Sequence, residues 1–186
     1  MCHEIRQHIP EFRINVNISY IQMVKSDIWK DILSSIKQYD LPPECLCAEL
    51  TESGYTDMTP YFYKLRKKFE EKNLQFVLDD FGTGFSNLHC IVNMKPNYVK
   101  LDNDFTAKAM SNARDFELLK KIVEMVHSID IRICIEGIEK EEWYQKLKEI
   151  HVDYLQGYLF GKPCEKNQFL NKFIFHCTDQ ENLTDL

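Results

Sequence analysis

The stretch FVLDDFGTGFSNL, residues 76–88, joins a short apolar run to two adjacent carboxylates, Asp79 and Asp80. Two like charges at the end of a buried strand repel each other and lose hydration, so one of them tends to keep its proton unless a cation compensates. A divalent metal ion is the usual cation where further oxygen ligands lie nearby. The alternative is that Asp80 caps a helix beginning near Ser86, or starts a turn with Gly82.

The composition predicts one globular domain over residues 1–186, because 44% of the residues are hydrophobic and 28% are charged. The 23 basic and 29 acidic residues give a net charge of -6, which argues against binding to long nucleic acid. No apolar run approaches the ~20 residues of a membrane span, and the first residues lack the apolar core of a signal peptide. We therefore expect a cytoplasmic protein without membrane contact.

The seven cysteines are odd in number and scattered, which is typical of reduced thiols and not of a disulfide framework. Cys45 and Cys47 are a weak signal for zinc, because no second ligand pair completes a tetrahedral site. We interpret them as buried core thiols.

Short apolar or β-branched runs alternate with amphipathic helical stretches along the chain. The expected strands are 13–18, 46–50, 75–79, 98–101, 131–135 and 154–156, and the expected helices are 21–39, 60–72, 86–92, 113–129, 140–150 and 166–175. This order predicts a parallel α/β sheet covered by helices, either doubly wound or a TIM-type (β/α) barrel. The doubly wound option is weak, because no GxGxxG follows the first strand and no Walker lysine motif is present. A complete eight-unit barrel needs ~250 residues. We therefore expect an incomplete barrel of about six βα units.

The phase of the predicted strands places polar residues on one face. Side chains alternate between the two faces of a strand, so the polar residue near each carboxyl end fixes which neighbours face the helices. The residues assigned to the inward face are Asn17, Glu49, Asp79, Lys100, Glu136 and Gln156. The residues assigned to the outward face are all apolar: Ile14, Val16, Ile18, Leu46, Ala48, Leu50, Phe76, Leu78, Val99, Leu101, Ile131, Ile133, Ile135 and Leu155. Six polar groups therefore converge on the carboxyl-terminal mouth, where parallel barrels carry out chemistry. Arg13, Gln75 and Arg132 also face inward, at the opposite end.

The inward oxygens indicate a metal site. Asn17, Glu49, Asp79 and Asp80 supply hard oxygen ligands that suit Mg2+ or Mn2+ better than zinc. Two ions about 3.5–4 Å apart serve in-line displacement at phosphorus. Glu136 adds a further ligand or a general base.

Lys100 brings a positive charge into this acidic mouth, where it would hold the attacking water or the phosphoryl oxygens. The alternative for Lys100 is a salt bridge to Asp102 or to a neighbouring carboxylate. Glu139 is either a loop-fixing carboxylate or a favourable charge at a helix N-terminus. Glu52 either braces the loop 79–84 or is a solvated loop carboxylate.

Six motifs together resemble the EAL-domain family across nearly the whole chain. They are NVNIS (15–19), AELTES (48–53), DDFGTGFSNL (79–88), YVKLD (98–102), IEGIE (135–139) and YLQGYLFGKP (154–163). The resemblance implies a modified TIM barrel that hydrolyses cyclic di-GMP to linear pGpG with two Mg2+ or Mn2+ ions.

The resemblance also implies roles for individual residues. The implied metal ligands are Asn17, Glu49, Asp79, Asp80 and Glu136, and the implied catalytic residues are Lys100, Glu136 and Asp80. The implied substrate-binding residues are Gln156, Gly157, Tyr158 and Pro163. The implied loop-positioning residues are Glu52, Glu139, Gly82 and Gly84. Glu52 matches the glutamate that positions the loop after the family's fifth strand, and the family links this loop to dimerisation.

The family begins with two strands and a helix that carry the Glu-Ala-Leu signature, and this segment is missing before Met1. We expect the chain to be a fragment of a longer signalling protein or a truncated gene product. Exposed sheet edges then predict a homodimer. Three interpretations stay open: a phosphodiesterase, a module that binds cyclic di-GMP without cleaving it, and a non-catalytic dimerisation fragment.

Overall fold

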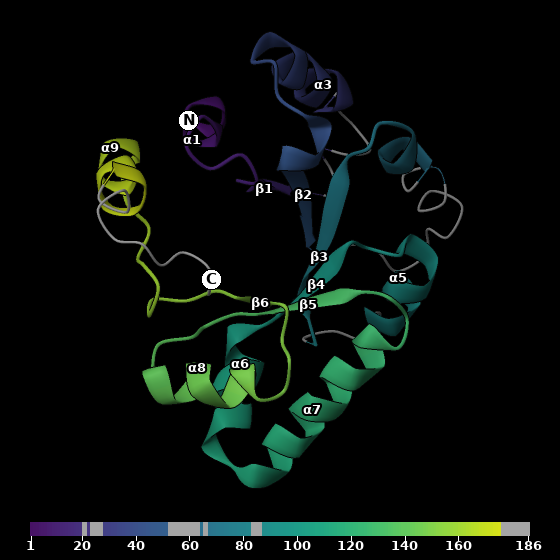
Figure 1. Ribbon diagram of the computed structural model, residues 1–186. Coiled ribbons are helices and arrows are strands. Elements are labelled where there is room, and N and C mark those ends of the chain that lie inside the picture. The colour runs from purple at the N-terminus through teal and green to yellow at the C-terminus, as the bar shows by residue number, and fades with distance from the viewer. Residues whose placement is uncertain (20–21, 23–27, 52–63, 65–66, 83–86, 176–186) are drawn as a thin grey trace.

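Six parallel strands form one open sheet in the order β1-β2-β3-β4-β5-β6 (Figure 1). The computed structural model describes residues 1–19, 22, 28–51, 64, 67–82 and 87–175. The strands are β1 (Ile14–Ile18), β2 (Leu46–Thr51), β3 (Gln75–Phe81), β4 (Tyr98–Leu101), β5 (Arg132–Ile135) and β6 (Tyr154–Leu155). All five pairings are parallel, so every carboxyl end opens on the same rim. The predicted incomplete α/β barrel is confirmed.

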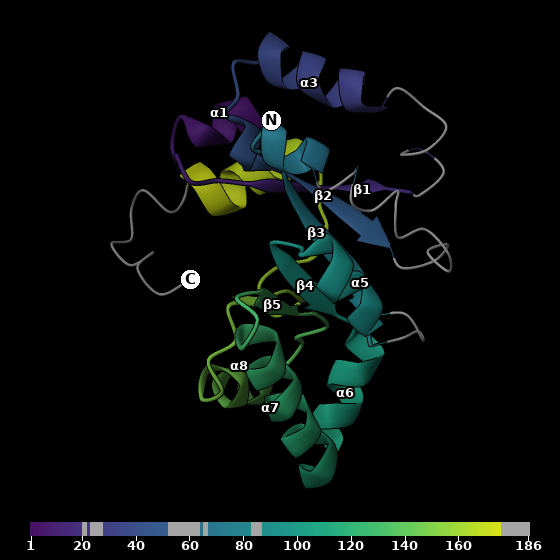
Figure 2. The ribbon, with the colours of Figure 1, turned by 90° about the vertical axis from the view of Figure 1, so that its right-hand side faces the viewer.

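Helices α3, α5, α6, α7 and α8 cover the outer face of the sheet, whereas α1 and α9 lie elsewhere (Figure 2). The described α-helices are α1 (Cys2–Arg6), α3 (Ile28–Gln38), α5 (Asn87–Met94), α6 (Asn103–Ser111), α7 (Ala113–His127), α8 (Glu141–Lys148) and α9 (Lys166–Phe169). A 3-10 helix, η1 (Pro43–Cys45), and a π-helix, η2 (Leu170–Phe175), complete the set. No helix in the described part of the chain is both long enough and apolar enough to span a bilayer.

Two helices were not expected from the sequence. Helix α6 directly follows β4, and the side chain of Asp102 caps it by accepting hydrogen bonds from the backbone amides of Asp104 and Phe105. Helix α1 has only five residues. The predicted helix 60–72 lies largely outside the described residues, although 67–71 are helical.

The outward face of the sheet forms the main core, as the strand phase predicted. Residues from β2 to β5 pack there against α3, α5, α6, α7 and α8. Ala48, Val99 and Ile133 are fully buried, whereas Val16 on the edge strand β1 is 37% exposed. Val16 was expected to be covered, but β1 pairs with β2 alone among the described strands. The core is therefore most complete around the central strands.

A hydrogen bond across the concave face shows how strongly the sheet curls. Nδ2 of Asn15 on β1 donates to the hydroxyl oxygen of Tyr98 on β4, over 2.7 Å. The two strands are three places apart in the sheet order, so their side chains meet only because the sheet bends round on itself. In the described residues β1 and β6 each pair with one strand, which leaves the ring open.

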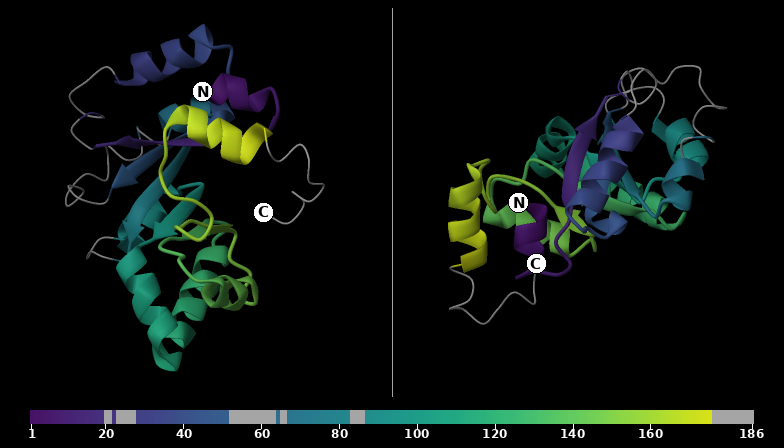
Figure 3. Two further views of the ribbon diagram at one scale, coloured as in Figure 1. Left: turned by 90° about the vertical axis from the view of Figure 1, so that its left-hand side faces the viewer. Right: turned by 90° about the horizontal axis from the view of Figure 1, so that it is seen from above.

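A second, smaller apolar cluster joins the two ends of the described chain. Ile5 of α1 packs with Leu170 and Ile174 of η2, and Lys166 of α9 forms an ion pair of 2.6 Å with Glu4. Figure 3 shows α1 (purple) and α9 (yellow) side by side. These contacts hold segments from opposite ends of the sequence together.

We expect Ile133→Ala to lower the free energy of unfolding by about 2–5 kcal/mol, because Ile133 is fully buried on a central strand. Ile129→Ala is the matched control, since Ile129 is 46% exposed, and its effect should stay within about 0.5 kcal/mol. Urea unfolding measures both changes. Similar losses in the two variants would contradict the assignment of the core.

Candidate active site

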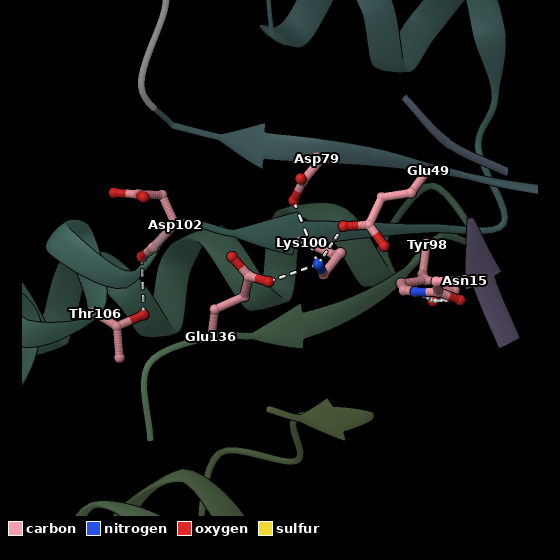
Figure 4. A network of polar contacts seen from close by, with 8 residues as sticks. All are labelled: Asn15, Glu49, Asp79, Tyr98, Lys100, Asp102, Thr106 and Glu136. Atoms are coloured by element: carbon pink, nitrogen blue, oxygen red, sulfur yellow. Dashed lines mark hydrogen bonds and ion pairs between the residues drawn. The ribbon is translucent and has the colours of Figure 1, made fainter. Parts of the chain in front are cut away.

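The ammonium group of Lys100 lies at the centre of three carboxylates on the concave face (Figure 4). Its Nζ is 2.5 Å from Oε1 of Glu49, 2.6 Å from Oε1 of Glu136 and 3.5 Å from Oδ1 of Asp79. These residues come from β4, β2, the loop after β5, and β3. The predicted convergence of polar residues at the mouth is therefore confirmed for these four. We call them the Lys100 cluster.

Burial and charge act against each other in this cluster. Burial by itself would lower the pKa of Lys100, but the hydrogen bonds to Glu136 and Glu49 outweigh it and raise that pKa above its ordinary value. Burial raises the pKa of Glu136, assisted by the charges of Asp79 and Glu49 and opposed by Lys100. One cation thus serves three acidic groups, and the cluster retains an excess of negative charge.

The sequence offered two partners for a salt bridge of Lys100: Asp102 or a neighbouring carboxylate. The bridge to Asp102 is wrong, because that carboxylate caps α6 instead. The pairing with neighbouring carboxylates is correct. A structural ion pair and a chemical role for Lys100 are compatible, since both need the same buried position.

A β-bulge shapes the strand end at the two aspartates. The pairing of β3 with β4 shifts register between Leu78 and Phe81. Strand β3 also ends at Phe81, two residues beyond its predicted end at Asp79. Asp80 has a φ of 54° and Gly82 a φ of 105°, both in the left-handed region. Burial and then the charge of Asp79 raise the pKa of Asp80. The sequence predicted the carboxylate pair correctly but not this bulge.

Asp79 provides the test of whether a cation fits the site. Its Oδ1 atom is buried and accepts no hydrogen bond from a described residue, and its ion pair with Nζ of Lys100 is 3.5 Å long. A buried carboxylate oxygen without a hydrogen bond is costly unless a cation contacts it. No three His, Cys, Asp or Glu side chains within the described ranges are arranged as a metal site as they stand. The donor set fits a hard divalent ion, but its carboxylates now surround Lys100.

The remaining expected ligands and supports lie in different places. Asn17 is paired in register with Glu49 at the carboxyl end of β1, but it is exposed and no hydrogen bond links it to the Lys100 cluster within the described residues. Glu139 is exposed just before α8 and makes no ion pair with any described residue. Glu52 and Gly84 lie outside the described residues. The structure therefore brings Asn17 near the site, but it does not bring Glu139 into it.

The four expected substrate-binding residues line one cavity beside the mouth. Gln156, Gly157, Tyr158 and Pro163 surround a space of about 540 Å3 together with aromatic side chains of the last helical segment. Tyr158 is 57% exposed. Because small-molecule pockets are typically 300–1,000 Å3 and largely apolar, this cavity has the size and character of a binding pocket.

A backbone crossing fixes this cavity to the Lys100 cluster. The amide of Ile138, in the loop after β5, donates to the carbonyl of Gln156 over 3.0 Å, and the amide of Leu159 donates back to the carbonyl of Ile138. A Cβ atom at Gly157 would lie 2.1 Å from the carbonyl oxygen of Ile138. Only glycine permits this contact, which holds Gln156 next to the loop after β5 that carries Glu136.

Sequence reasoning missed a second layer of side chains below the mouth. Asn15, Cys47, Tyr98 and Cys134 lie on the same concave face, one inward position nearer the amino ends of the strands. Burial raises the pKa of Cys134 to about 12. The alternation that located the mouth also places side chains on the same face two residues earlier in each strand, so it could have predicted this layer.

The sequence profile of the EAL domain matches residues 1–163. The chain belongs to the EAL domain family. Among curated relatives of this EAL domain, the signalling protein YkoW of Bacillus subtilis is 29% identical over 170 residues, which are 91% of this chain and 21% of YkoW. The cyclic di-GMP phosphodiesterase PdeL of Escherichia coli is 26% identical over 171 residues, which are 91% of this chain and 47% of PdeL.

Solved EAL structures share the fold. The EAL enzyme Bd1971, in a form with cAMP and cyclic di-GMP bound, aligns with a TM-score of 0.84 and 27% identity, over 91% of this chain and 47% of that chain. An EAL domain protein from Listeria monocytogenes aligns with a TM-score of 0.78 and 28% identity, over 91% of this chain and 68% of that one. The EAL domain described here spans about a fifth of YkoW and about half of PdeL.

We expect Lys100→Met to lower the free energy of unfolding of the metal-free EAL domain by about 3–5 kcal/mol at pH 7, because it leaves buried carboxylates without a cation. The loss should shrink as the pH falls, since protonation removes the uncompensated charges. Urea unfolding in a chelator measures both effects.

The matched control is Lys121→Met, which removes an exposed lysine paired with Glu124 at 2.7 Å and should cost no more than about 1 kcal/mol. Adding Glu49→Gln to Lys100→Met should recover part of the lost stability. A Lys100→Met variant as stable as the wild type at pH 7 would show that the cluster is not stabilised by its cation.

Proposed function

We propose that this EAL domain is a metal-dependent phosphodiesterase that hydrolyses cyclic di-GMP to linear pGpG. The observation that carries the proposal is the convergence of Glu49, Asp79 and Glu136 on Lys100 at the carboxyl-terminal mouth of the sheet. Membership of the EAL family and relatives named as cyclic di-GMP phosphodiesterases, such as PdeL, support the substrate.

In this proposal Asn17, Glu49, Asp79, Asp80 and Glu136 hold two Mg2+ or Mn2+ ions. All five supply oxygen, the donor that these cations prefer. Oδ1 of Asp79 has an ion pair with Lys100 but no hydrogen bond, and the pKa values of Asp80 and Glu136 are raised, so these are positions where a bound cation would stabilise the charged carboxylates. Bound ions would supply water activation and neutralisation of the phosphate charge.

Lys100 has a separate part in the chemistry. Its ammonium is held rigidly by short contacts to Glu49 and Glu136, so it can donate hydrogen bonds without reorganisation. Placed against a phosphodiester, it would hold the attacking water and the phosphoryl oxygens as negative charge develops. Glu136, whose pKa burial raises, is suited to accept a proton from that water.

The cavity beside the mouth would hold a guanine base. It contains a polar side chain, Gln156, next to the exposed ring of Tyr158 and the ring of Pro163. A flat base can stack on such rings while an amide reads its edge. Because Gln156 is linked by backbone hydrogen bonds to Ile135 and Ile138, a base bound there would lie at a fixed offset from the Lys100 cluster.

A second function is favoured by the open sheet. The described strands supply only part of a ring, so the mouth lacks the walls that a closed barrel would give it. A mouth of this kind can bind cyclic di-GMP without cleaving it. Turnover separates the two functions, because only the phosphodiesterase releases pGpG.

We expect the chain to convert cyclic di-GMP to pGpG in Mn2+ and to lose this activity in a chelator. Glu49→Gln and Asp79→Asn should each lower the rate at least 100-fold, because each removes a charged oxygen ligand. Chromatography of the reaction products measures the conversion.

Glu117→Gln is the control, since Glu117 pairs with Lys120 on the exposed face of α7, and its rate should equal that of the wild type. Saturable binding of cyclic di-GMP without product would favour the binding module. Absence of both would leave the non-catalytic dimerisation fragment.

We also propose that the chain forms a homodimer. Leu88 and Val92 are one turn apart on α5 and are 59% and 68% exposed, which gives this helix an apolar outer surface. Together with the open edges at β1 and β6, such a surface is typical of a contact site.

Leu88→Lys should convert the dimer to a monomer, because it places a charge in the proposed contact. Leu118→Lys on α7 is the matched control, since Leu118 is 51% exposed on another helix, and it should leave the dimer intact. Light scattering coupled to size exclusion gives the mass. A wild-type chain that is monomeric at all tested concentrations refutes the dimer.

A further inference from the structure

Two buried thiols from distant parts of the sequence touch beside the amino end of β2. Sγ of Cys2, on α1, donates a hydrogen bond to Sγ of Cys45 over 3.8 Å. Cys45 is the last residue of η1 and directly precedes β2, 43 positions further along the chain. Cys2 is 7% exposed and Cys45 is fully buried. The contact therefore joins the start of the chain to the sheet.

This thiol pair needs only a small displacement to form a disulfide. Sulfur atoms 3.8 Å apart are in van der Waals contact, and a disulfide bond is about 2.0 Å long. Burial, and then the neighbouring Cys2, raise the pKa of Cys45 to about 11. A thiol reacts as its thiolate, so Cys45 is unreactive at neutral pH while α1 covers it. Any oxidation of the pair therefore begins with a movement of α1.

Helix α1 is easily displaced, because little holds it in place. It has five residues, far fewer than the ~12–15 that an isolated helix needs to persist in water. It is held by Ile5 against η2 and by the exposed ion pair between Glu4 and Lys166. Terminal segments of this kind open locally without unfolding of the whole domain. Opening of α1 exposes both sulfurs to a small oxidant.

Helix α1 also supports one wall of the cavity beside the mouth. Ile5 packs with Leu170 and Ile174, and Phe169 and Phe173 pack against the same cluster. Phe169 and Phe173 also line that cavity. A bond that fixes α1 to the sheet therefore acts on this wall through the smaller apolar cluster.

We propose that Cys2 and Cys45 form a reversible disulfide, made by exchange with a small-molecule disulfide, that fastens α1 to the amino end of β2. The thiolate of Cys2, the more exposed of the two, attacks the oxidant, forms a mixed disulfide and releases one small thiolate. The thiolate of Cys45 then attacks Sγ of Cys2 and releases the second. Two cysteine thiols thus lose two electrons and two protons, and one small disulfide becomes two small thiols. The modification does not depend on the proposed hydrolysis of cyclic di-GMP.

Peptide mapping by mass spectrometry tests the bond in the native chain, after incubation with oxidised glutathione and alkylation of the remaining thiols. We expect a cross-linked peptide pair that joins Cys2 to Cys45 and disappears on treatment with dithiothreitol. Cys164 is the internal control, because its exposed thiol should form a mixed disulfide with glutathione under the same conditions. Glutathione on Cys164 without a link between Cys2 and Cys45 overturns the proposal.

Thermal unfolding measures the effect of the bond on the fold. Oxidation should raise the Tm of the wild type by about 5 °C or more, because the bond closes a loop over 43 positions of the chain. Cys2→Ser should abolish this rise, and Cys2→Ala serves the same purpose if the serine variant is misfolded. Cys47→Ser is the matched control, since Cys47 is also buried and lies two residues beyond Cys45, and it should keep the rise. Equal rises in the wild type and in the Cys2 variant overturn the proposal.

Hydrogen exchange shows whether the bond reaches the cavity wall. The amides of η2 should exchange about threefold or more slowly in the oxidised chain than in the reduced chain. The amides of α7, which packs in the main core, should exchange equally in both. Unchanged exchange in η2 of a chain that carries the cross-link would overturn the effect on the wall.

Discussion

The candidate active site depends on a single buried cation. Lys100 lies between carboxylates from β2, β3 and the loop after β5, and without it these groups would repel one another in a desolvated position. The sheet must therefore bring carboxylates from three other segments close to one atom of a side chain on β4. Parallel strands in sequential order achieve this because their carboxyl ends meet at one rim.

Much of the fold could be predicted from the sequence, because apolar and polar residues alternate along β2 to β5 and fix both position and facing. The sequence did not predict helices α6 and α1, which lack a clear local pattern. Helix α6 has little amphipathic contrast and begins at a cap, Asp102, that also reads as a site residue. Helix α1 is short and gains its packing from η2, more than 160 residues away in the sequence.

The candidate site was predicted in outline but not in its pairing. Alternation indicates that Glu49, Asp79, Lys100 and Glu136 share a face, yet it cannot tell which of them touch. That depends on how far the sheet curls, as the contact between Asn15 and Tyr98 shows, and on the bulge at Asp80. Neither has a local sequence signal. The same alternation could have predicted that side chains of the second layer, such as Tyr98, face the concave side.

The crossing at Gly157 has a mechanical consequence. With no side chain to separate the two loops, the segment after β6 is pinned by hydrogen bonds to the segment after β5. The backbone of Gln156 is hydrogen-bonded to Ile135 and Ile138, the residues on either side of Glu136 and Gly137. In the proposed function, these hydrogen bonds would tie the binding of a base at Gln156 to the placement of the reacting phosphate.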